Sequence, residues 1–258
     1  MENANAFATY PSLRDRVIVI TGGATGIGEA IVEAFTAQNA QVIFLDIQDE
    51  AAEKLIERLT SAGAHAPVYF RCDLTEISEL QVTVQSIVAE FGKVDVLVNN
   101  AGNDTRHAVA EVTPAFWDQA IAVNLKHQFF MSQAVIPSMQ KAQRGSIINM
   151  SSIGWIIPST NQVVYVTSKA AIVGLTRTLS HELGGDNIRV NCVMPGWILT
   201  ERQERLWLNE RLRVQVLDKQ ALKRMITPED VARLVLFLAA DDSSAITNQS
   251  YVIDGGWV

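Results

Sequence analysis

The sequence predicts an α/β fold, a single doubly wound domain in which a parallel sheet of about seven strands has helices on both faces. Short β-branched runs alternate with longer helical patterns along nearly the whole chain. Most of these runs are apolar without polar alternation, as expected for strands covered on both sides. No linker, repeat or low-complexity stretch divides the 258 residues, so residues 1–258 are expected to form one domain.

The individual elements follow from the same two patterns. The expected strands are residues 16–21, 41–46, 67–73, 94–100, 145–151, 188–195 and 250–254. The expected helices are residues 26–39, 49–62, 76–91, 114–140, 162–183 and 228–240. Residues 197–225 interrupt the alternation, because they are charged, helix-prone and contain two tryptophans. An insertion of that length in a compact fold more often covers a binding site than merely connects two elements, so a helical substrate lid is expected there.

The composition excludes several classes of function. The formal net charge is -7, which argues against binding a nucleic acid by bulk electrostatics. Cys72 and Cys192 lie far apart and match no metal-ligand or redox spacing, which favours reduced thiols and no metal site. The first residues lack the apolar region of a signal peptide, and no apolar run reaches the roughly 18 residues of a membrane span. We expect a soluble cytoplasmic protein without membrane partners.

A glycine-rich turn follows the first expected strand. In "TGGATGIGEAIVEAF", Gly22, Gly26 and Gly28 stand between that strand and an amphipathic helix. Glycines let backbone N–H groups and the helix N-terminus approach a pyrophosphate. Such a turn also occurs for packing alone, but the strand before it and the helix after it favour a dinucleotide site. The Lys-Ser or Lys-Thr ending of a P-loop is missing.

Acidic residues end the second and third expected strands. Asp46 stands eighteen residues after Gly28, where a carboxylate accepts hydrogen bonds from the adenosine ribose and repels a 2′-phosphate. No arginine follows in "DIQDE", so NAD is favoured over NADP. Asp73 is placed to accept from the adenine amino group, although capping the next helix explains it nearly as well. The run "NNAG" at 99–102 either lets the backbone lie along the cofactor or forms an ordinary turn.

The stretch "YVTSK" begins the helix after the fifth expected strand. Tyr165 and Lys169 are four residues apart, so they share one helix face. A neighbouring ammonium favours the phenolate and would bring the pKa of the tyrosine below its ordinary value of about 10. Ligands of an open α/β sheet bind beyond the carboxyl ends of the strands. The other polar residues expected there are Asn99, Asn124, Ser151, Ser152 and the loop 195–200.

In this order and spacing the motifs resemble the short-chain dehydrogenase/reductase family over essentially the full chain. The matching pieces are "TGGATGIG", Asp73, "NNAG", Asn124, the serine pair ending thirteen residues before Tyr165, "YVTSK" and "PGWILT". The resemblance implies a Rossmann-type domain, often a tetramer. Its catalytic set falls on Ser152, Tyr165, Lys169 and Asn124, with Tyr165 taking the substrate hydroxyl proton while hydride passes to the nicotinamide.

The resemblance also implies a role for each residue of the site. Lys169 and the positive nicotinamide would stabilise the phenolate, and Lys169 would hold the nicotinamide ribose. Ser152 would bind the reacting oxygen, and Asn124 would anchor a water that relays protons to Lys169. Thr200 would contact the nicotinamide carboxamide. The expected cofactor-binding residues are Gly22, Thr25, Gly26, Ile27, Gly28, Asp46, Asp73, Leu74, Asn100, Ala101, Gly102, Tyr165, Lys169, Pro195, Gly196, Ile198 and Thr200.

Further segments resemble the bacterial NAD-dependent aldose 1-dehydrogenases of this family, particularly those for D-xylose. They are "YPSL", "VIFLDI", "RCDL", "VDVLVNNAGNDTRH", "PEDVARLVLFLAADDSS" and "DGGWV". The resemblance implies oxidation of an anomeric hydroxyl to a lactone. A sugar needs oriented polar groups and apolar faces. The candidate substrate residues are Asn103, Asp104, Arg106, His107, Trp155, Gln162 and Trp197, each of which also has a purely structural explanation.

Other interpretations stay open. The 3-oxoacyl carrier-protein reductases share the motifs, but they usually use NADP and need a basic surface, which Asp46 and the acidic balance oppose. A sugar-acid or polyol dehydrogenase is a second alternative, with Arg106 suited to a carboxylate. A cofactor-binding regulator without turnover is a third, which the intact set of Ser152, Tyr165 and Lys169 disfavours.

Three further expectations concern assembly and the histidines. The apolar character of residues 114–140 and 162–183, together with the resemblance, predicts a homotetramer with a four-helix contact between subunits. The ending "DGGWV" is expected to reach a neighbouring subunit. His65, His127 and His181 lie away from the motifs, which predicts surface or packing roles for them.

Overall fold

A computed structural model describes residues 7–61 and 65–258. Residues 1–6, which belong to the chain start predicted to lack a signal peptide, lie outside these ranges, and so does residue 62 of the predicted helix 49–62. Within the described residues, seven strands form one parallel sheet in the order β3-β2-β1-β4-β5-β6-β7. They are β1 (Val17–Thr21), β2 (Gln41–Asp46), β3 (Val68–Arg71), β4 (Val96–Asn99), β5 (Gly145–Met150), β6 (Ile188–Pro195) and β7 (Ser250–Ile253). The predicted fold class is confirmed, and every predicted strand is present.

The helices also follow the prediction closely. They are α1 (Gly26–Ala37), α2 (Asp49–Ser61), α3 (Ile77–Phe91), α4 (Pro114–Ile121), α5 (His127–Ala142), α6 (Val163–Leu183), α7 (Glu201–Leu206), α8 (Glu210–Lys219) and α9 (Pro228–Ala239). The predicted helix 114–140 differs in one respect, because a π-helical turn, Ala122–Lys126, joins α4 to α5. Such turns are frequent at functional sites, and this one contains Asn124.

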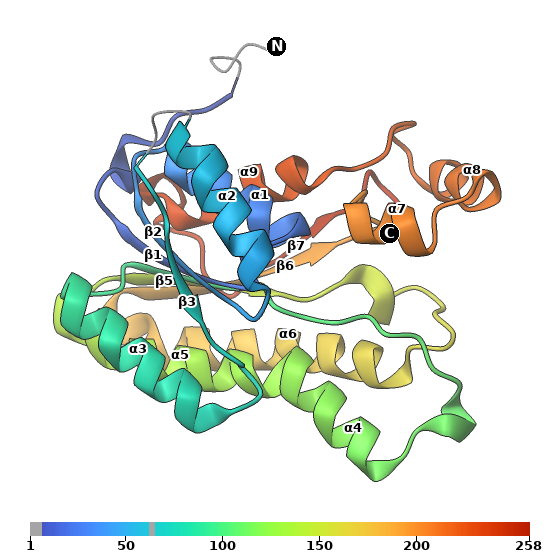
Figure 1. Cartoon of the computed structure of the whole chain (residues 1–258), viewed down its shortest axis with the longest axis horizontal. Helices are drawn as coiled ribbons and strands as arrows, with labels where there is room; N and C mark the ends of the chain where they lie inside the picture. Colours follow the sequence, from blue (N-terminus) through green and yellow to red (C-terminus); the bar gives the residue numbers. More distant parts are fainter. Residues whose placement is uncertain (1–6, 62–64) are drawn as a thin grey trace.

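Helices cover the sheet on both faces (Figure 1). Helices α1, α2 and α9 lie above it in that view, and α3, α5 and α6 lie below. Strand β1 shows why its sequence lacks polar alternation: Ile18 and Ile20 belong to the upper core and Val17 and Val19 to the lower one. Each side chain of β1 is buried, so burial on both faces favours apolar residues along the whole strand.

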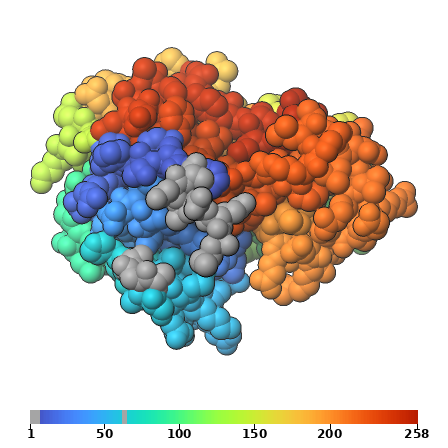
Figure 2. Space-filling model, turned by 90° about the horizontal axis from the view of Figure 1, so that it is seen from above, coloured from blue at the N-terminus to red at the C-terminus, as the bar shows by residue number. Residues whose placement is uncertain are grey.

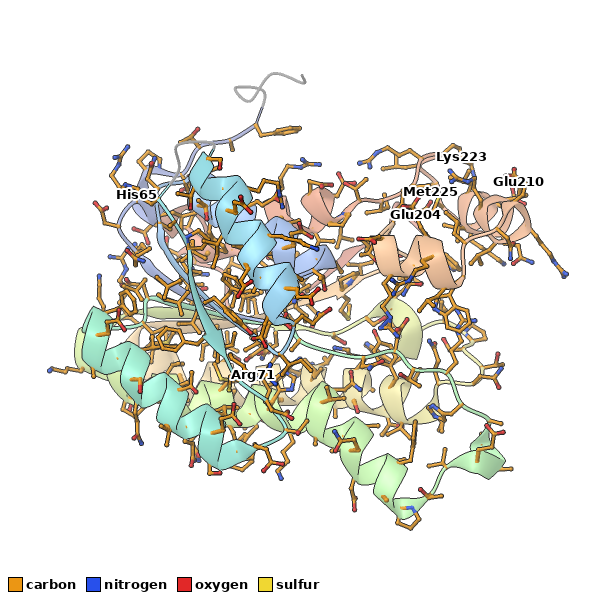
Figure 3. The ribbon with its side chains drawn as sticks, in the orientation of Figure 1. His65, Arg71, Glu204, Glu210, Lys223 and Met225 are labelled. Carbon is orange, nitrogen blue, oxygen red and sulfur yellow. The ribbon has the colours of Figure 1, made fainter. Side chains whose placement is uncertain are left out.

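The predicted lid segment, residues 197–225, projects from one end of the sheet. It contains α7 and α8, which form the right-hand side of the molecule in Figure 2 and carry the labelled Glu204 and Glu210 in Figure 3. Ile198 and Ile226 form an isolated parallel bridge, so the two ends of the segment are held together at its base. Among the described helices none is long and apolar enough to cross a membrane.

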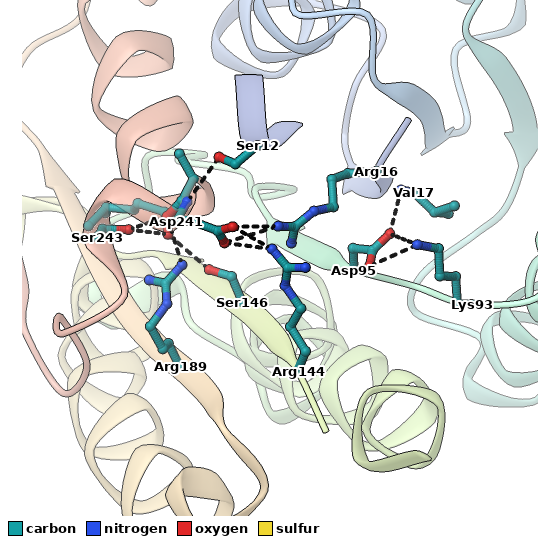
Figure 4. Close-up of polar contacts among 12 residues, drawn as sticks. Ser12, Arg16, Val17, Lys93, Asp95, Arg144, Ser146, Arg189, Asp241 and Ser243 are labelled. Carbon is teal, nitrogen blue, oxygen red and sulfur yellow. Dashed lines mark hydrogen bonds and ion pairs between the residues drawn. The ribbon is translucent and has the colours of Figure 1, made fainter. Parts of the chain in front are cut away.

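The amino ends of the strands meet in a cluster of ion pairs (Figure 4). Arg16, ahead of β1, and Arg144, ahead of β5, both donate to the carboxylate of Asp241, at 3.0 and 2.6 Å. Nearby, the carboxylate of Asp95 accepts from the backbone N–H of Val17 at 2.9 Å and pairs with Lys93 at 3.0 Å. The cluster joins the chain segments that lead into the central strands.

Candidate active site

A cavity of about 1310 Å³ lies beyond the carboxyl ends of the strands. It is lined by the segments that follow β1 to β6, by the start of α6 and by the lid segment. Ligands of open α/β sheets bind at this edge of the sheet. Every predicted cofactor-binding residue lines it. Segments that are far apart in the sequence therefore converge on one space large enough for a dinucleotide and a small substrate.

The glycine turn presents bare backbone to this cavity. Gly22 and Gly26 have φ of +65° and +62°, a region that side-chain-bearing residues rarely adopt. A Cβ on Gly28 would stand 1.8 Å from the carbonyl oxygen of Gly22, and one on Gly22 would stand 2.8 Å from Cα of Ala101. The turn therefore admits no larger residue at these positions. The exposed amides at the start of α1 fit the pyrophosphate of a dinucleotide.

Asp46 is fixed at the end of β2 by backbone donors. Its Oδ2 accepts from Ala24 N at 2.9 Å, and its Oδ1 accepts from Ile47 N at 2.8 Å and Gln48 N at 3.1 Å. Each carboxylate oxygen accepts about two hydrogen bonds, so Oδ2 keeps a position open to a ribose hydroxyl. Asp73 also lines the cavity, and its Oδ1 accepts from the N–H and hydroxyl of Thr75 in the turn before α3. It does not cap that helix, whose N-cap residue is Glu76.

The two asparagines of "NNAG" turn in opposite directions. Asn100 donates from Nδ2 to the carbonyls of Thr21 and Gly22, at 3.0 and 2.9 Å, and so ties β4 to the glycine turn. Asn99 was expected among the polar groups at the open edge. It is instead fully buried inside the molecule, where its Nδ2 donates to Asn149 Oδ1 at 2.9 Å. The period of two along a strand sends adjacent side chains to opposite faces.

The predicted pair on α6 meets at the inner end of the cavity. Lys169 Nζ lies 5.5 Å from the ring centroid of Tyr165 and donates to the carbonyl of Met150 at 2.9 Å. Ser152 forms a side-chain hydrogen bond with Tyr165, and its Oγ accepts from Gly154 N at 3.0 Å. Ser151 Oγ donates to the carbonyl of Lys169 at 2.6 Å, so Ser152 is the serine of the pair that contacts the phenol.

Burial sets the charge states of this pair. It lowers the pKa of Lys169 to about 8, because no carboxylate contacts the buried ammonium in the described chain. It raises the pKa of Tyr165 to about 12, against the lowering effect of the Ser152 hydrogen bond and with a further rise from the charge of Asp104. The chain's own groups, Lys169 included, thus do not bring the pKa of Tyr165 below 10 as the sequence suggested. Desolvation of the phenolate is the larger effect.

Asn124 lies behind the cavity rather than in its lining. Its Oδ1 accepts from Asn103 N at 2.8 Å, while its Nδ2 donates to the carbonyls of Asn103 and Ala120, each at 3.0 Å. A Cβ built on Gly102 would stand 3.1 Å from Asn124 Oδ1 and 3.2 Å from Lys169 Nζ, so both groups border the same small space. The carboxamide holds the loop after β4 in place, and the predicted water near Lys169 stays a prediction.

The candidate substrate residues divide into two groups. Asn103, Asp104, Arg106, Gln162 and Trp197 line the cavity. His107 and Trp155 do not line it, so substrate contacts by these two are not supported. His107 is buried, with Nδ1 bonded to the carbonyl of Thr105 at 3.0 Å and Nε2 near Val164 N at 3.5 Å. It acts as a structural link between the loop after β4 and the start of α6.

Several residues near the site were not predicted. Trp257, in the ending expected to reach a neighbouring subunit, lines the cavity. Arg202 and Gln203 also line it, and both contact Asp104. His127 was placed away from the motifs, but it is fully buried and close enough to Lys169 for that charge to act on it. Burial lowers its pKa to about 3, and neither ring nitrogen makes a well-formed hydrogen bond within the described chain.

Known proteins resemble this chain along nearly its whole length. A family model described as enoyl-(acyl carrier protein) reductase matches residues 22–258. The D-xylose 1-dehydrogenase of Caulobacter vibrioides is 49% identical over 250 residues, which cover 97% of this chain and 98% of that protein. The Rhizobium meliloti protein named "Probable galactose dehydrogenase GalD" is 46% identical over 96% of each chain. The crystal structure of a 3-oxoacyl-(acyl-carrier protein) reductase from Brucella melitensis is 32% identical, with a TM-score of 0.89 over 96% of this chain and 94% of that one.

Proposed function

The chain belongs to the short-chain dehydrogenase/reductase family, and we propose that it oxidises the anomeric hydroxyl of an aldose to a lactone with NAD as hydride acceptor. It is an oxidoreductase that acts on a CH–OH group. The observation that carries the proposal is the convergence of Ser152, Tyr165 and Lys169 with the glycine turn on one cavity. The similarity to D-xylose and galactose dehydrogenases supports an aldose as the substrate.

The residues of the cavity suit NAD. The glycine turn accepts a pyrophosphate, and Asp46 offers an acceptor to the adenosine ribose while its charge opposes the 2′-phosphate of NADP. When bound, the cofactor supplies the hydride acceptor and a positive ring that favours an anionic phenolate nearby. Lys169 has three donors and uses one on Met150, which leaves two for the ribose hydroxyls of the nicotinamide half. The Thr200 hydroxyl, at the rim of the glycine turn, suits the carboxamide.

The chain's own residues supply the proton chemistry. Tyr165 takes the proton of the substrate hydroxyl, and Ser152 holds the reacting oxygen beside it. Because burial raises the pKa of Tyr165 to about 12, the phenolate needs positive charge close by, which Lys169 supplies in part. Lys169, whose pKa is lowered to about 8, can release a proton near neutral pH through a water anchored near Asn124.

Two of the arginines that line the cavity have partners within the chain. Arg106 stacks over the ring of Trp207, with its guanidinium carbon 4.1 Å from the centroid. Arg202 pairs with Asp104 at 3.2 Å. The carboxylate partner makes Arg202 less available to a sugar acid, which supports a neutral sugar as the substrate. The formal net charge of -7 also opposes docking of an acidic carrier protein.

The test is NADH formation by the purified protein with NAD or NADP and a panel of pentoses, hexoses and deoxysugars. Sugar acids, simple polyols and 3-hydroxyacyl thioesters serve as controls. We expect fast turnover of one aldose with NAD and a preference of at least about tenfold over NADP, since a repelled 2′-phosphate costs on the order of 1.4 kcal/mol or more. Turnover of a thioester or an acid, with every aldose inactive, would contradict the proposal.

We also propose that the protein is a cytoplasmic homotetramer and that the lid segment, residues 197–225, covers the bound substrate. Trp117, Phe129 and Val163 leave about two-fifths of their surface exposed on α4, α5 and α6, which suits a helix contact between subunits. Light scattering at working concentration should give four times the 28.3 kDa chain mass. A monomeric mass would contradict the assembly without affecting the proposed reaction.

A further inference from the structure

The loop after β4 and the lid helix α7 are joined across the cavity. Asp104 Oδ1 pairs with Arg202 Nη1 at 3.2 Å, and Asp104 Oδ2 accepts from Gln203 Nε2 at 2.9 Å. A second contact runs parallel to the first, because the Arg106 guanidinium lies 4.1 Å from the Trp207 ring centroid. Asp104 is therefore held from the lid side by two donors, in one orientation.

This carboxylate still has acceptor positions to offer. An ionised carboxylate has about four lone-pair sites, and the two contacts from α7 use one on each oxygen. About a fifth of the Asp104 side chain is exposed, and the residue lines the cavity. On the other side of the residue, the backbone carbonyl of Asp104 accepts from Gln162 Nε2 at 3.5 Å, near the start of α6. A carboxylate that two donors hold in place and that is open to the cavity is preorganised to accept a hydrogen bond.

The charge of Asp104 also reaches the catalytic pair. It raises the pKa of both Tyr165 and Lys169. No other carboxylate of the described chain is among the causes for either group. Asp104 thus lies on the substrate side of the catalytic pair, and an anion bound beside it would meet a like charge in a site of low dielectric constant.

We propose that Asp104, positioned by Arg202 and Gln203, determines specificity by accepting a hydrogen bond from a hydroxyl of the substrate and by excluding substrates that carry an anionic group at that position. This inference rests on the proposed function, because it names the chemistry by which that same cavity selects an uncharged polyhydroxylated substrate. Selection has two parts: a hydrogen bond that only a hydroxyl-bearing substrate completes, and a repulsion that rejects acids.

The test compares Asp104→Ala with wild type on the best aldose of the panel, on its monodeoxy analogues and on the corresponding sugar acid. We expect kcat/KM for the full aldose to fall by about 100-fold, since the substitution removes a hydrogen bond to a charged, largely buried group. One deoxy analogue should lose less than about threefold on the same substitution, because the wild-type protein already lacks that hydrogen bond with it. Turnover of the sugar acid should rise in absolute terms.

Equal losses with the aldose and all its deoxy analogues would overturn the inference, and so would an unchanged aldose kcat/KM. Thermal unfolding and NADH binding establish that the variant is folded and loaded. If wild type oxidises a neutral polyol but no aldose, the proposed aldose is wrong, and the same comparison is made on that polyol. If wild type prefers an acid, or turns over nothing in the panel, both proposals are overturned.

A pH profile separates a charge effect from a structural one. Tyr165 is faced by Ser152, Lys169 and Asp104, and Lys169 by Cys192, His127 and Asp104. Asp104→Asn should lower the pKa of the ascending limb of kcat/KM, because it removes the charge that raises the pKa of both Tyr165 and Lys169. Arg202→Gln, which leaves the carboxylate without its cation, should shift that limb upward. Identical profiles for wild type and both variants would show that the charge does not reach the reacting groups.

Discussion

The charged groups at the two ends of the sheet differ in whether they have a partner of opposite charge. At the amino ends, Arg16 and Arg144 share one carboxylate, and Asp95 is met by an ammonium and a backbone N–H. At the carboxyl ends, Lys169 is buried, and its ammonium donates to the carbonyl of Met150 and to no other group of the described residues. Tyr165 is half-buried beside it, and burial disfavours its ionised form.

We infer that the paired charges at the amino ends serve stability, whereas the groups at the carboxyl ends serve proton transfer. Matched charges lie near their lowest free energy and gain nothing by changing protonation state. A cation without a counter-ion has a displaced pKa, which makes it a better participant in proton transfer near neutral pH. Substitutions at the two ends of the sheet test this division.

The largest effect is expected from removing a phenol at the carboxyl end. Tyr165→Phe should lower kcat by about 10²–10⁴-fold, the range for loss of a general acid–base group, while NADH binding is retained. Tyr10→Phe is the matched control, because that half-buried phenol lies near Asp242 at the amino end, and its kcat should not change. Stopped-flow or steady-state NADH absorbance measures both. Similar losses in the two variants would contradict the division.

The second prediction compares two buried aspartates. Asp46→Ala should raise KM for NAD by about 10–100-fold, because a hydrogen bond to a charged acceptor contributes about 1.5–3 kcal/mol. Asp95→Ala removes the acceptor of Val17 N and the partner of Lys93, so it should lower the denaturation midpoint while KM for NAD stays constant. An unchanged KM in Asp46→Ala would remove this residue from the cofactor site.

The third prediction concerns His127 and pH. Burial lowers its pKa to about 3 in the folded chain, against an ordinary value of 6.5. Between these two pH values the imidazole therefore binds a proton in the unfolded chain but not in the folded chain. The stability present above pH 6.5 is therefore lost as the pH falls towards 3, by on the order of 2 kcal/mol at pH 5. His127→Phe should remove this loss in urea titrations at pH 7 and 5.

The exposed His65, labelled in Figure 3, provides the control for that experiment. Because the side chain of His65 is exposed to water in the folded chain, His65→Gln should keep the wild-type pH dependence of stability. If His127→Phe also keeps it, another group must be responsible for the loss of stability in acid.

The smallest effect is expected at the amino-end cluster. Asp241→Asn leaves the buried Arg16 and the half-exposed Arg144 without a carboxylate and should lower the free energy of unfolding by about 1 kcal/mol. Because Asp241 is itself about half exposed, water replaces part of the lost interaction. Addition of 1 M salt should shrink the difference, whereas kcat should equal that of wild type. A changed kcat would show that the ion pairs at the amino ends affect the candidate active site, which would contradict the division.

The sequence by itself determined the features that depend on neighbours along the chain. Strand burial follows from unbroken apolar runs such as Val17–Thr21, the glycine turn from its need for positive φ at Gly22 and Gly26, and the Tyr165–Lys169 pair from helical spacing. These are local constraints, and packing changed none of them. The carboxyl-edge position of the site followed as well, because parallel strands bring their ends together.

Only the tertiary structure decided contacts between distant segments. Asp104 and Gln203 are 99 residues apart, and nothing near either one in the sequence indicates that they pair. His127 approaches Lys169 because the π-helical turn that leads into α5 packs against α6. The ring nitrogens of His107 contact the carbonyl of Thr105 and the backbone N–H of Val164 at the start of α6, and the residue does not line the cavity. The pKa of Tyr165 depends in the same way on how much water the fold excludes. Such properties arise from burial and long-range packing, which the chain specifies only as a whole.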